Sequence, residues 1–177
     1  DQKQHVEIAR DIAERINHNY KADLFALPEP KIDNQVKTII GLDGRKMSKS
    51  YDNTIPLFLD EKPLLKRINQ IVTNSQAPEE PKDPDQSSVF NLHKLLLSET
   101  EEQALRGRYR AGGMGWGQAK KDYFEALNAK LQGPRKEYRR LMADPGALQG
   151  VLAQGRDKAR ARASVFLDKV RSTIGIR

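Results

Sequence analysis

A short polar stretch at residues 46–50, with the sequence Lys-Met-Ser-Lys-Ser, holds the side chains of this chain that are best suited to chemistry. It places two ammonium groups and two hydroxyls next to each other, shortly after Gly44. Lysine brings a compact positive charge and serine donates hydrogen bonds to phosphate oxygens, so such a loop can hold a polyphosphate. An ordinary solvated basic loop has the same composition, and from composition alone it is the commoner case.

A second basic group lies near the C-terminus, where every second residue is positively charged: Arg156, Lys158, Arg160 and Arg162. On a helix this spacing spreads the side chains around more than half of the circumference, so some of them face solvent. Residues 1–100 contain 14 Lys and Arg against 16 Asp and Glu, whereas residues 101–177 contain 17 against 8. A basic C-terminal half is typical of proteins that bind nucleic acid, although a solvated helical surface gives the same counts.

The other residue types indicate no further chemistry. The chain has no cysteine and only three scattered histidines, so disulfides and cysteine-based zinc sites are excluded and we predict no metal site. The lack of cysteine favours a reducing compartment, and we expect the protein in the cytoplasm. No apolar run approaches the roughly 18 residues of a membrane span, and the N-terminus, which reads like the middle of a gene, is not that of a signal peptide. His93 and Trp116 are interpreted as packing residues.

The order of predicted elements in residues 1–60 is typical of an α/β domain. Apolar residues recur at helical spacing between residues 5 and 19, and the β-branched run at residues 36–41 predicts a short strand. A helix followed by such a strand is typical of α/β sheet domains. One unit is too little for a free-standing sheet, so we expect the end of a larger domain.

Residues 61–177 predict helices alone. Helix starts are indicated at Asp60 with Pro63, at Ser88, at a capping box from Ser98 to Glu101, and at Asp144 with Pro145. A long helix over residues 119–142 is expected to be kinked or broken at Gly133-Pro134. The last helical segment runs to about residue 174, with these apolar residues inward: Leu148, Val151, Leu152, Ala159, Ala163, Phe166 and Val170. The predicted fold class is thus mainly α, with an all-α helical bundle after residue 60.

The motifs together resemble the tryptophanyl-tRNA synthetases, a family of class I aminoacyl-tRNA synthetases. The Lys-Met-Ser-Lys-Ser loop is similar to the second class I signature, and the Asp-Gln-Lys-Gln-His sequence at residues 1–5 is similar to a family segment that precedes that loop by about the same interval. Asn53 also matches the family, and weaker landmarks are found at residues 113–117 and 155–159. The similarity is strong at residues 1–16 and 41–53 and looser elsewhere.

The resemblance assigns roles to individual residues. Asp1 matches a carboxylate that binds the ATP ribose, Gln2 matches a polar contact to tryptophan, and the backbone near Lys37 would face the adenine. Lys46 and Lys49 match the catalytic lysines on the β- and γ-phosphates of ATP. Met47, Ser48 and Ser50 complete the ATP-binding loop. Arg156, Lys158, Arg160 and Arg162 are the candidates for contacts to RNA phosphates.

The resemblance also implies an architecture. Residues 1–60 would be the C-terminal remnant of a Rossmann-type nucleotide-binding catalytic domain, and residues 61–177 a helical domain that binds tRNA at its anticodon. The implied partners are tryptophan, ATP with its Mg²⁺ and the tryptophan tRNA, and the full-length protein would be a homodimer.

One departure from the family limits what this chain can do. The first class I signature, of the His-Ile-Gly-His type, is absent, as is the carboxylate that reads the indole N–H. We therefore expect a C-terminal fragment of a tryptophan–tRNA ligase that is inactive alone. Two alternatives remain open: a relative of the tyrosyl-tRNA synthetases, and a non-catalytic RNA-binding module that retains the loop as a relic.

Overall fold

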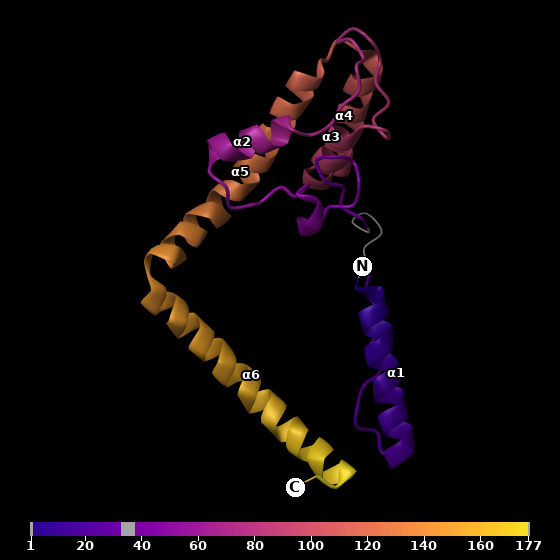
Figure 1. Cartoon of the computed structure of the whole chain (residues 1–177), viewed down its shortest axis with the longest axis vertical. Helices are drawn as coiled ribbons and strands as arrows, with labels where there is room; N and C mark the ends of the chain where they lie inside the picture. The colour runs from indigo at the N-terminus through magenta and orange to yellow at the C-terminus, as the bar shows by residue number, and fades with distance from the viewer. Residues whose placement is uncertain (1, 33–37, 177) are drawn as a thin grey trace. The chain divides into compact units, whose positions relative to one another are not determined.

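The computed structural model describes residues 2–32 and 38–176, which fold mainly as α-helices (Figure 1). The helical elements are α1 (Lys3–Tyr20), η2 (Lys49–Tyr51), α2 (Glu61–Asn69), α3 (Ser88–His93), η3 (Lys94–Leu96), α4 (Glu99–Ala111), α5 (Trp116–Ala143) and α6 (Pro145–Ile174). The predicted mainly-α class is confirmed.

The chain divides into two compact units. Asn34–Arg139 form one unit, and Asp1–Asp33 with Arg140–Arg177 form the other. The boundary expected at residue 60, and the Rossmann-type origin of residues 1–60, stay predictions.

The strand expected over residues 36–41 is not formed in its described part, residues 38–41. A single antiparallel bridge between Ile40 and Lys46 stands in its place. A strand needs continuous pairing with a neighbour, and here the chain pairs with its own return for only a few residues. Residues 36 and 37 lie outside the described part of the chain.

The core of the larger unit lies between α2, α3, α4 and α5. Leu64 and Ile68 on α2 are fully buried, and they pack in one cluster with Tyr123 and Leu127 of α5. These pairs are spaced by four residues, so each helix turns one continuous apolar stripe inward. Each fully buried side chain of this kind contributes about 1.5–3 kcal/mol, which makes α2 and α5 a rigid support for the loops that join them.

Side-chain caps begin several helices where the residue types predict them. Ser98 and Glu101 form the expected capping box of α4, and the side chain of Asp144 accepts a hydrogen bond from the Ala147 amide at the start of α6. The cap of α3 is Ser87 rather than Ser88, since the Ser87 hydroxyl accepts from the Phe90 amide.

A buried lysine holds the long connection between α2 and α3. The Lys82 ammonium group, on a residue that is 2% exposed, donates hydrogen bonds to the carbonyl oxygens of Ala77 and Glu80 at 2.8 and 2.9 Å. It also lies 5.5 Å from the centre of the Trp116 ring. The interpretation of Trp116 as a packing residue agrees with this contact and with its hydrogen bond to Asn74 at 3.0 Å.

Helix α5 continues through Gly133-Pro134, where a kink or break was expected. Proline has no N–H to donate to the carbonyl of Lys130, so one backbone hydrogen bond of the helix is lost there. Leu131 and Arg135, on either side of this position, are both buried, so this stretch of the helix stays packed against the rest of the protein.

The apolar stripe expected to face inward on α6 does not do so. None of the α6 residues is buried, and Val151, Leu152 and Val165 are among the most exposed apolar residues of the described chain. Phe166 makes an edge-to-face contact with Phe25, with ring centres 5.4 Å apart. Periodicity identifies the apolar face of a helix but not what covers it, and this explains why the prediction was wrong.

Helix α1 confirms the helix predicted at residues 5–19 and begins two residues earlier. Its end is fixed by Lys21, which has a left-handed backbone with φ of 48°, and by Asn17. The Asn17 side chain bonds the backbone of Leu24 and Phe25 and so folds the next segment back onto the helix. None of the helices in the described residues is long and apolar enough to cross a membrane.

Candidate functional site

The loop at residues 46–50 is the return arm of a short hairpin-like turn in the larger unit. The Gly41 amide donates to the Arg45 carbonyl at 2.7 Å, and the Met47 amide donates to the Ile39 carbonyl at 2.9 Å. Gly44 turns the chain with a positive φ of 79°, a conformation that favours glycine. This turn fixes where the loop begins.

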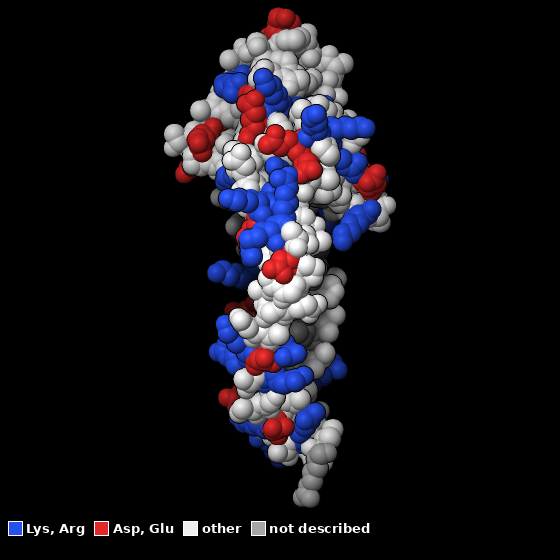
Figure 2. Space-filling model, turned by 90° about the vertical axis from the view of Figure 1, so that its left-hand side faces the viewer, with Lys and Arg blue, Asp and Glu red and all other residues white. Residues whose placement is uncertain are grey.

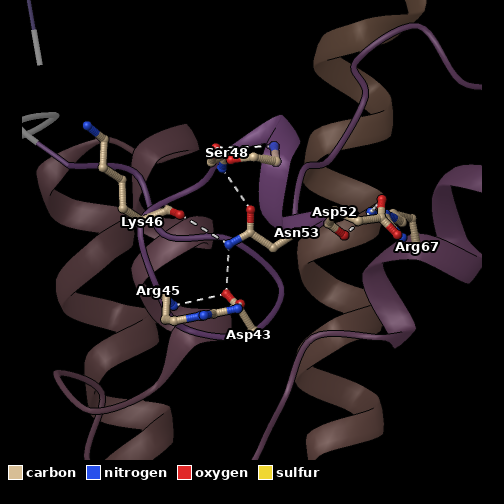
Figure 3. A network of polar contacts seen from close by, with 8 residues as sticks. Asp43, Arg45, Lys46, Ser48, Asp52, Asn53 and Arg67 are labelled. Atoms are coloured by element: carbon tan, nitrogen blue, oxygen red, sulfur yellow. Dashed lines mark hydrogen bonds and ion pairs between the residues drawn. The ribbon is translucent and has the colours of Figure 1, made fainter.

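The side chain of Asn53 is the centre of the hydrogen bonds that hold the 46–50 loop (Figure 3). Its side-chain oxygen accepts a hydrogen bond from the Ser48 amide at 2.7 Å, and its nitrogen donates to the Lys46 carbonyl at 3.1 Å and to Asp43 at 2.8 Å. Asn53 is only 2% exposed. One buried carboxamide therefore satisfies groups on both sides of the loop, and buried bonds of this kind are costly to leave unmade.

Asp43 is held ionised beside this network. The hydrogen bond from Asn53, followed by contacts with Arg45, lowers the pKa of the Asp43 carboxyl to about 2. The Arg45 Nε donates to the carboxylate at 2.7 Å, and the guanidinium lies 4.6 Å from the centre of the Tyr51 ring. The positive charge of Arg45 is thus neutralised by the neighbouring Asp43 carboxylate.

The two serines of the loop contact each other. Their hydroxyl oxygens are 2.7 Å apart, and the Ser48 oxygen accepts a hydrogen bond from the Ser50 amide at 3.3 Å. This contact caps the short helix η2, whose first residue is Lys49. As a result Lys49 projects from the start of a helical turn with an exposed side chain.

Arg67 of α2 ties the end of the loop to the core. Its Nε donates to the Thr54 carbonyl at 2.9 Å, and its Nη2 contacts the Asp52 carboxylate at 2.7 Å. Asp52 has a left-handed backbone with φ of 48°, which turns the chain out of η2. Because α2 is packed into the core through Leu64 and Ile68, the loop rests on a rigid element.

Gly41 lies against this network so closely that no side chain fits. A Cβ atom there would lie 2.4 Å from the Asn53 side chain and 2.6 Å from the Asn53 backbone oxygen. Real Cβ atoms do not approach other atoms at such distances. The glycine is therefore required by contact, independently of its backbone angles.

The predicted site residues fall into three groups. Lys46, Lys49 and Ser50 are exposed on one loop, while Ser48 is half-buried and Met47 packs against the core. Gln2 is exposed at the start of α1 in the other unit. Asp1 and Lys37 lie outside the described residues.

The four basic candidates on α6 are all exposed. Arg156 and Arg160 are one helical turn apart on one side, and Lys158 and Arg162 form a similar pair on roughly the opposite side. Basic side chains, with a few acidic ones among them, are visible along the lower part of Figure 2.

Sequence reasoning missed the residues that support the loop. Asn53 was noted as a family match but not as the centre of a network, and Asp43 and Arg67 were not singled out. The burial of a polar residue such as Asn53 leaves no pattern in the sequence, because its hydrogen-bond partners come together only when the chain folds. No group of three or more His, Asp or Glu residues in the described part of the chain could hold a metal ion.

The side chains of the 46–50 loop are suited to binding an anion. Two lysines and two hydroxyls project from a backbone fixed by Asn53 and Arg67, so charge is presented without a reorganisation of the main chain. This arrangement suits a polyphosphate, the ligand class that the resemblance implies for this loop.

Comparisons with known proteins identify relatives of this chain. A tryptophan–tRNA ligase of Neisseria meningitidis is 49% identical over the whole chain, which covers 52% of that protein, and one of Pseudomonas putida is 47% identical, with 40% of it covered. A solved tryptophanyl-tRNA synthetase of Campylobacter jejuni, complexed with ADP and tryptophan, matches with a TM-score of 0.80 and 42% identity over 99% of this chain and 55% of that chain.

The chain thus spans about half the length of the curated relatives that it matches, and the predicted resemblance to tryptophanyl-tRNA synthetases is confirmed. The model of the family "tRNA synthetases class I (W and Y)" matches residues 1–132, most of the chain. Because this model covers well over half of the sequence, the chain belongs to the class I tRNA synthetases of the tryptophan and tyrosine type.

Proposed function

We propose that the protein containing this chain is a tryptophan–tRNA ligase, and that this chain supplies the phosphate grip and part of the tRNA-binding surface. The observation that carries the proposal is the Lys46–Ser50 loop held by Asn53, within a chain similar along its whole length to tryptophan–tRNA ligases. The named relatives favour tryptophan over tyrosine as the substrate, although the family model covers both kinds of enzyme.

The reaction would begin with attack of the tryptophan carboxylate oxygen on the α-phosphorus of ATP. A new carboxyl–phosphate bond forms, the bond to the β-phosphate oxygen breaks, and pyrophosphate leaves with the electron pair. The nucleophile is already ionised, so the protein needs to position the substrates and to stabilise the charge on the departing group. A second step passes the aminoacyl group to the terminal ribose of the tRNA and releases AMP.

The loop residues fit the first step. Lys46 and Lys49 would contact the β- and γ-phosphates, and the hydroxyls of Ser48 and Ser50 would donate hydrogen bonds to phosphate oxygens. The amides of Met47, Ser48 and Ser50 already donate to other groups of the protein, so the contacts to the phosphates would come mainly from side chains. We propose that Mg²⁺ arrives on the ATP phosphates and shares their charge.

The remaining roles concern the other parts of the chain. Asp1 would bind the ATP ribose and Gln2 the tryptophan, while the exposed basic residues of α6 would contact tRNA phosphates. Residues 1–60 would belong to the catalytic domain and residues 61–177 to the tRNA-binding domain. We also propose a homodimer in the cytoplasm, where tRNA is charged.

Tryptophan-dependent exchange of labelled pyrophosphate into ATP tests this function. The full-length protein should catalyse the exchange with tryptophan and not with tyrosine, whereas the 177-residue chain alone should not catalyse it with either. Exchange with tyrosine alone would replace the proposal by the tyrosine enzyme. A full-length protein that binds tRNA and exchanges with neither amino acid would instead support the non-catalytic RNA-binding module.

A further inference from the structure

The guanidinium of Arg67, on α2, holds the chain segment that follows the 46–50 loop (Figure 3). Its Nε donates to the Thr54 carbonyl oxygen at 2.9 Å, and its Nη2 donates to the Asp52 carbonyl oxygen and, at 2.7 Å, to the Asp52 carboxylate. Its Nη1 donates to the side-chain oxygen of Gln70 at 3.1 Å. Four of the five N–H donors of this guanidinium are therefore engaged within the protein, so it is not a group that waits for a ligand.

The two carbonyl groups that Arg67 holds lie on either side of Asn53, the residue that organises the loop. The Asn53 carbonyl oxygen between them accepts a hydrogen bond from the Leu42 amide at 2.9 Å. The main-chain carbonyls of residues 52–54 are thus all held by residues outside this segment. The conformations open to a side chain depend on its own main chain, so Arg67 also governs where the Asn53 carboxamide points.

The main chain at Asp52 needs such support. Its φ of 48° lies in the left-handed region, which is uncommon for residues other than glycine, although aspartate tolerates it. The Asp52 carboxylate is almost fully exposed, so its ion pair with Arg67 is screened by solvent and contributes little. The hydrogen bonds from Arg67 to the carbonyl oxygens are therefore the contacts that matter for the position of this segment.

Arg67 is in turn placed by the core of the larger unit. Its side chain is 20% exposed, and Leu64 and Ile68 of the same helix are fully buried. A guanidinium is planar and presents its donors in a fixed fork, so a firmly seated arginine transmits the position of its helix to the groups that it bonds. A continuous set of contacts thus leads from the core to residues 52–54.

We propose that Arg67 is a positioning residue for the formation of tryptophanyl-adenylate, which acts through Asn53 and touches no substrate. Asn53 holds the Ser48 amide and the Lys46 carbonyl, so a shift of its main chain moves the loop that carries Lys46 and Lys49. A displacement of about 1 Å in groups that grip the reacting phosphates costs about 10² in rate. The inference rests on the proposed function, because it assigns Arg67 to that reaction.

Single-turnover formation of tryptophanyl-adenylate by the full-length protein tests this role. Arg67→Met removes the hydrogen bonds and keeps a long side chain, so it should lower the rate constant by about 10–10² while tryptophan affinity stays near that of wild type. The matched control is Arg106→Met. The Arg106 side chain is 16% exposed and pairs with Asp85 and Glu102, outside residues 46–54. Both variants lose a partly buried guanidinium, and an equal slowing in both would trace the effect to lost stability and overturn the proposal.

A double-mutant cycle with Asn53→Ala shows whether Arg67 acts through Asn53. Residues that act through one another have non-additive effects. The double variant should therefore form the adenylate at a rate within about twofold of that of Asn53→Ala alone. If the losses of the two single variants multiply instead, Arg67 acts by a separate route and the proposal is wrong.

Hydrogen exchange gives a reading that needs no catalysis. Several amides of the loop and of η2 are hydrogen-bonded in the folded chain, among them those of Met47, Ser48, Tyr51 and Asp52. Exchange in a peptide that covers residues 46–54 therefore reports how firmly the loop is held, and it should be several-fold faster in Arg67→Met but unchanged in Arg106→Met. Faster exchange with a normal rate of adenylate formation would make Arg67 a structural residue alone and would overturn the proposal.

The kinetic and exchange readings also separate this inference from the proposed function. A wild-type protein that forms no tryptophanyl-adenylate would overturn both. An active wild type whose Arg67→Met variant keeps its rate and its exchange would overturn the role of Arg67 and leave the proposed function in place.

Discussion

The side-chain oxygen of Asn53 lies 2.7 Å from the backbone nitrogen of Ser48, so a residue outside the 46–50 loop fixes the middle of that loop. The same side chain reaches the Lys46 carbonyl, so the backbone at both residues is held by one carboxamide. The lysine and serine side chains are therefore presented from a main chain that does not need to be ordered by the ligand. Preorganisation of this kind is what favours stabilisation of developing charge.

Asn53→Ala should damage both stability and the first chemical step. The variant leaves the Ser48 amide and the Lys46 carbonyl without their Asn53 partner and removes one of the hydrogen bonds to the Asp43 carboxylate, which keeps those from Arg45. Each unmade buried bond costs about 1–3 kcal/mol. We expect a lower midpoint of urea unfolding and slower single-turnover formation of tryptophanyl-adenylate, with nearly normal tryptophan affinity. Asn91→Ala, which loses one bond to the Asp85 carbonyl, is the matched control and should leave the rate unchanged. A normal rate in Asn53→Ala would contradict the supporting role.

Lys49→Ala in the full-length protein should slow adenylate formation far more than it weakens tryptophan binding. A charge that matters most as pyrophosphate departs lowers kcat, whereas a contact made equally in the ground state alters KM. Loss of one preorganised donor costs about 10²–10³ in rate. Ser50→Ala should cost less, and the stability of Lys49→Ala should stay close to wild type because the side chain is exposed. Tryptophan affinity lost in proportion to the rate would show that the loop is not a phosphate grip.

If α6 lies against tRNA, only one of its two pairs of basic residues should contribute to tRNA binding, because the pairs lie on different sides of the helix. The double variants Arg156→Ala/Arg160→Ala and Lys158→Ala/Arg162→Ala remove the same charge from different sides of α6. One of them should flatten the salt dependence of tRNA binding by about 1.5, as expected for two phosphate contacts, and the other should change it little. Binding measured by filter retention over a range of salt checks this. Equal effects of both variants would indicate diffuse attraction rather than a contact surface.

The stability of the larger unit should fall as the pH drops below neutrality because of His93. Burial lowers the pKa of His93, with a smaller contribution in the same direction from Arg108, while Asp122 opposes them. The folded state thus favours the neutral ring, and its contribution to stability is present above the ordinary pKa of about 6.5 and is lost as the pH falls below it. Urea unfolding between pH 8 and pH 5 should show this loss, and His93→Gln should reduce it. An equal pH dependence in the variant would place the effect on other groups.

The sequence was sufficient for the elements whose signals are local. Ser98 and Asp144 begin helices because a short polar side chain bonds amides two or three residues ahead, and these partners can be read along the chain. The 46–50 loop was likewise singled out by residue types within a few positions, although its phosphate-binding role came from the family resemblance and stays a prediction. Local signals therefore gave the helix starts and the position of the candidate loop.

The sequence was insufficient where a residue depends on partners far along the chain. Arg135 has the composition of a solvated surface residue, yet the packing of α5 against α2 buries it beside Asn128 and leaves two donors unused. The opposite happened on α6, where an apolar stripe predicts burial and the described residues leave most of it exposed. Helical spacing gives the direction of a side chain but not the neighbour it meets.

The contact between Gly41 and Asn53 also constrains how this segment can change by mutation. A Gly41→Ala change clashes with the Asn53 side chain and, at 2.6 Å, with the Asn53 backbone oxygen. A smaller residue at position 53 would remove the first clash but not the second, because every residue has a backbone oxygen. A genetic selection for suppressors of Gly41→Ala should therefore yield reversion to glycine rather than a compensating replacement at position 53.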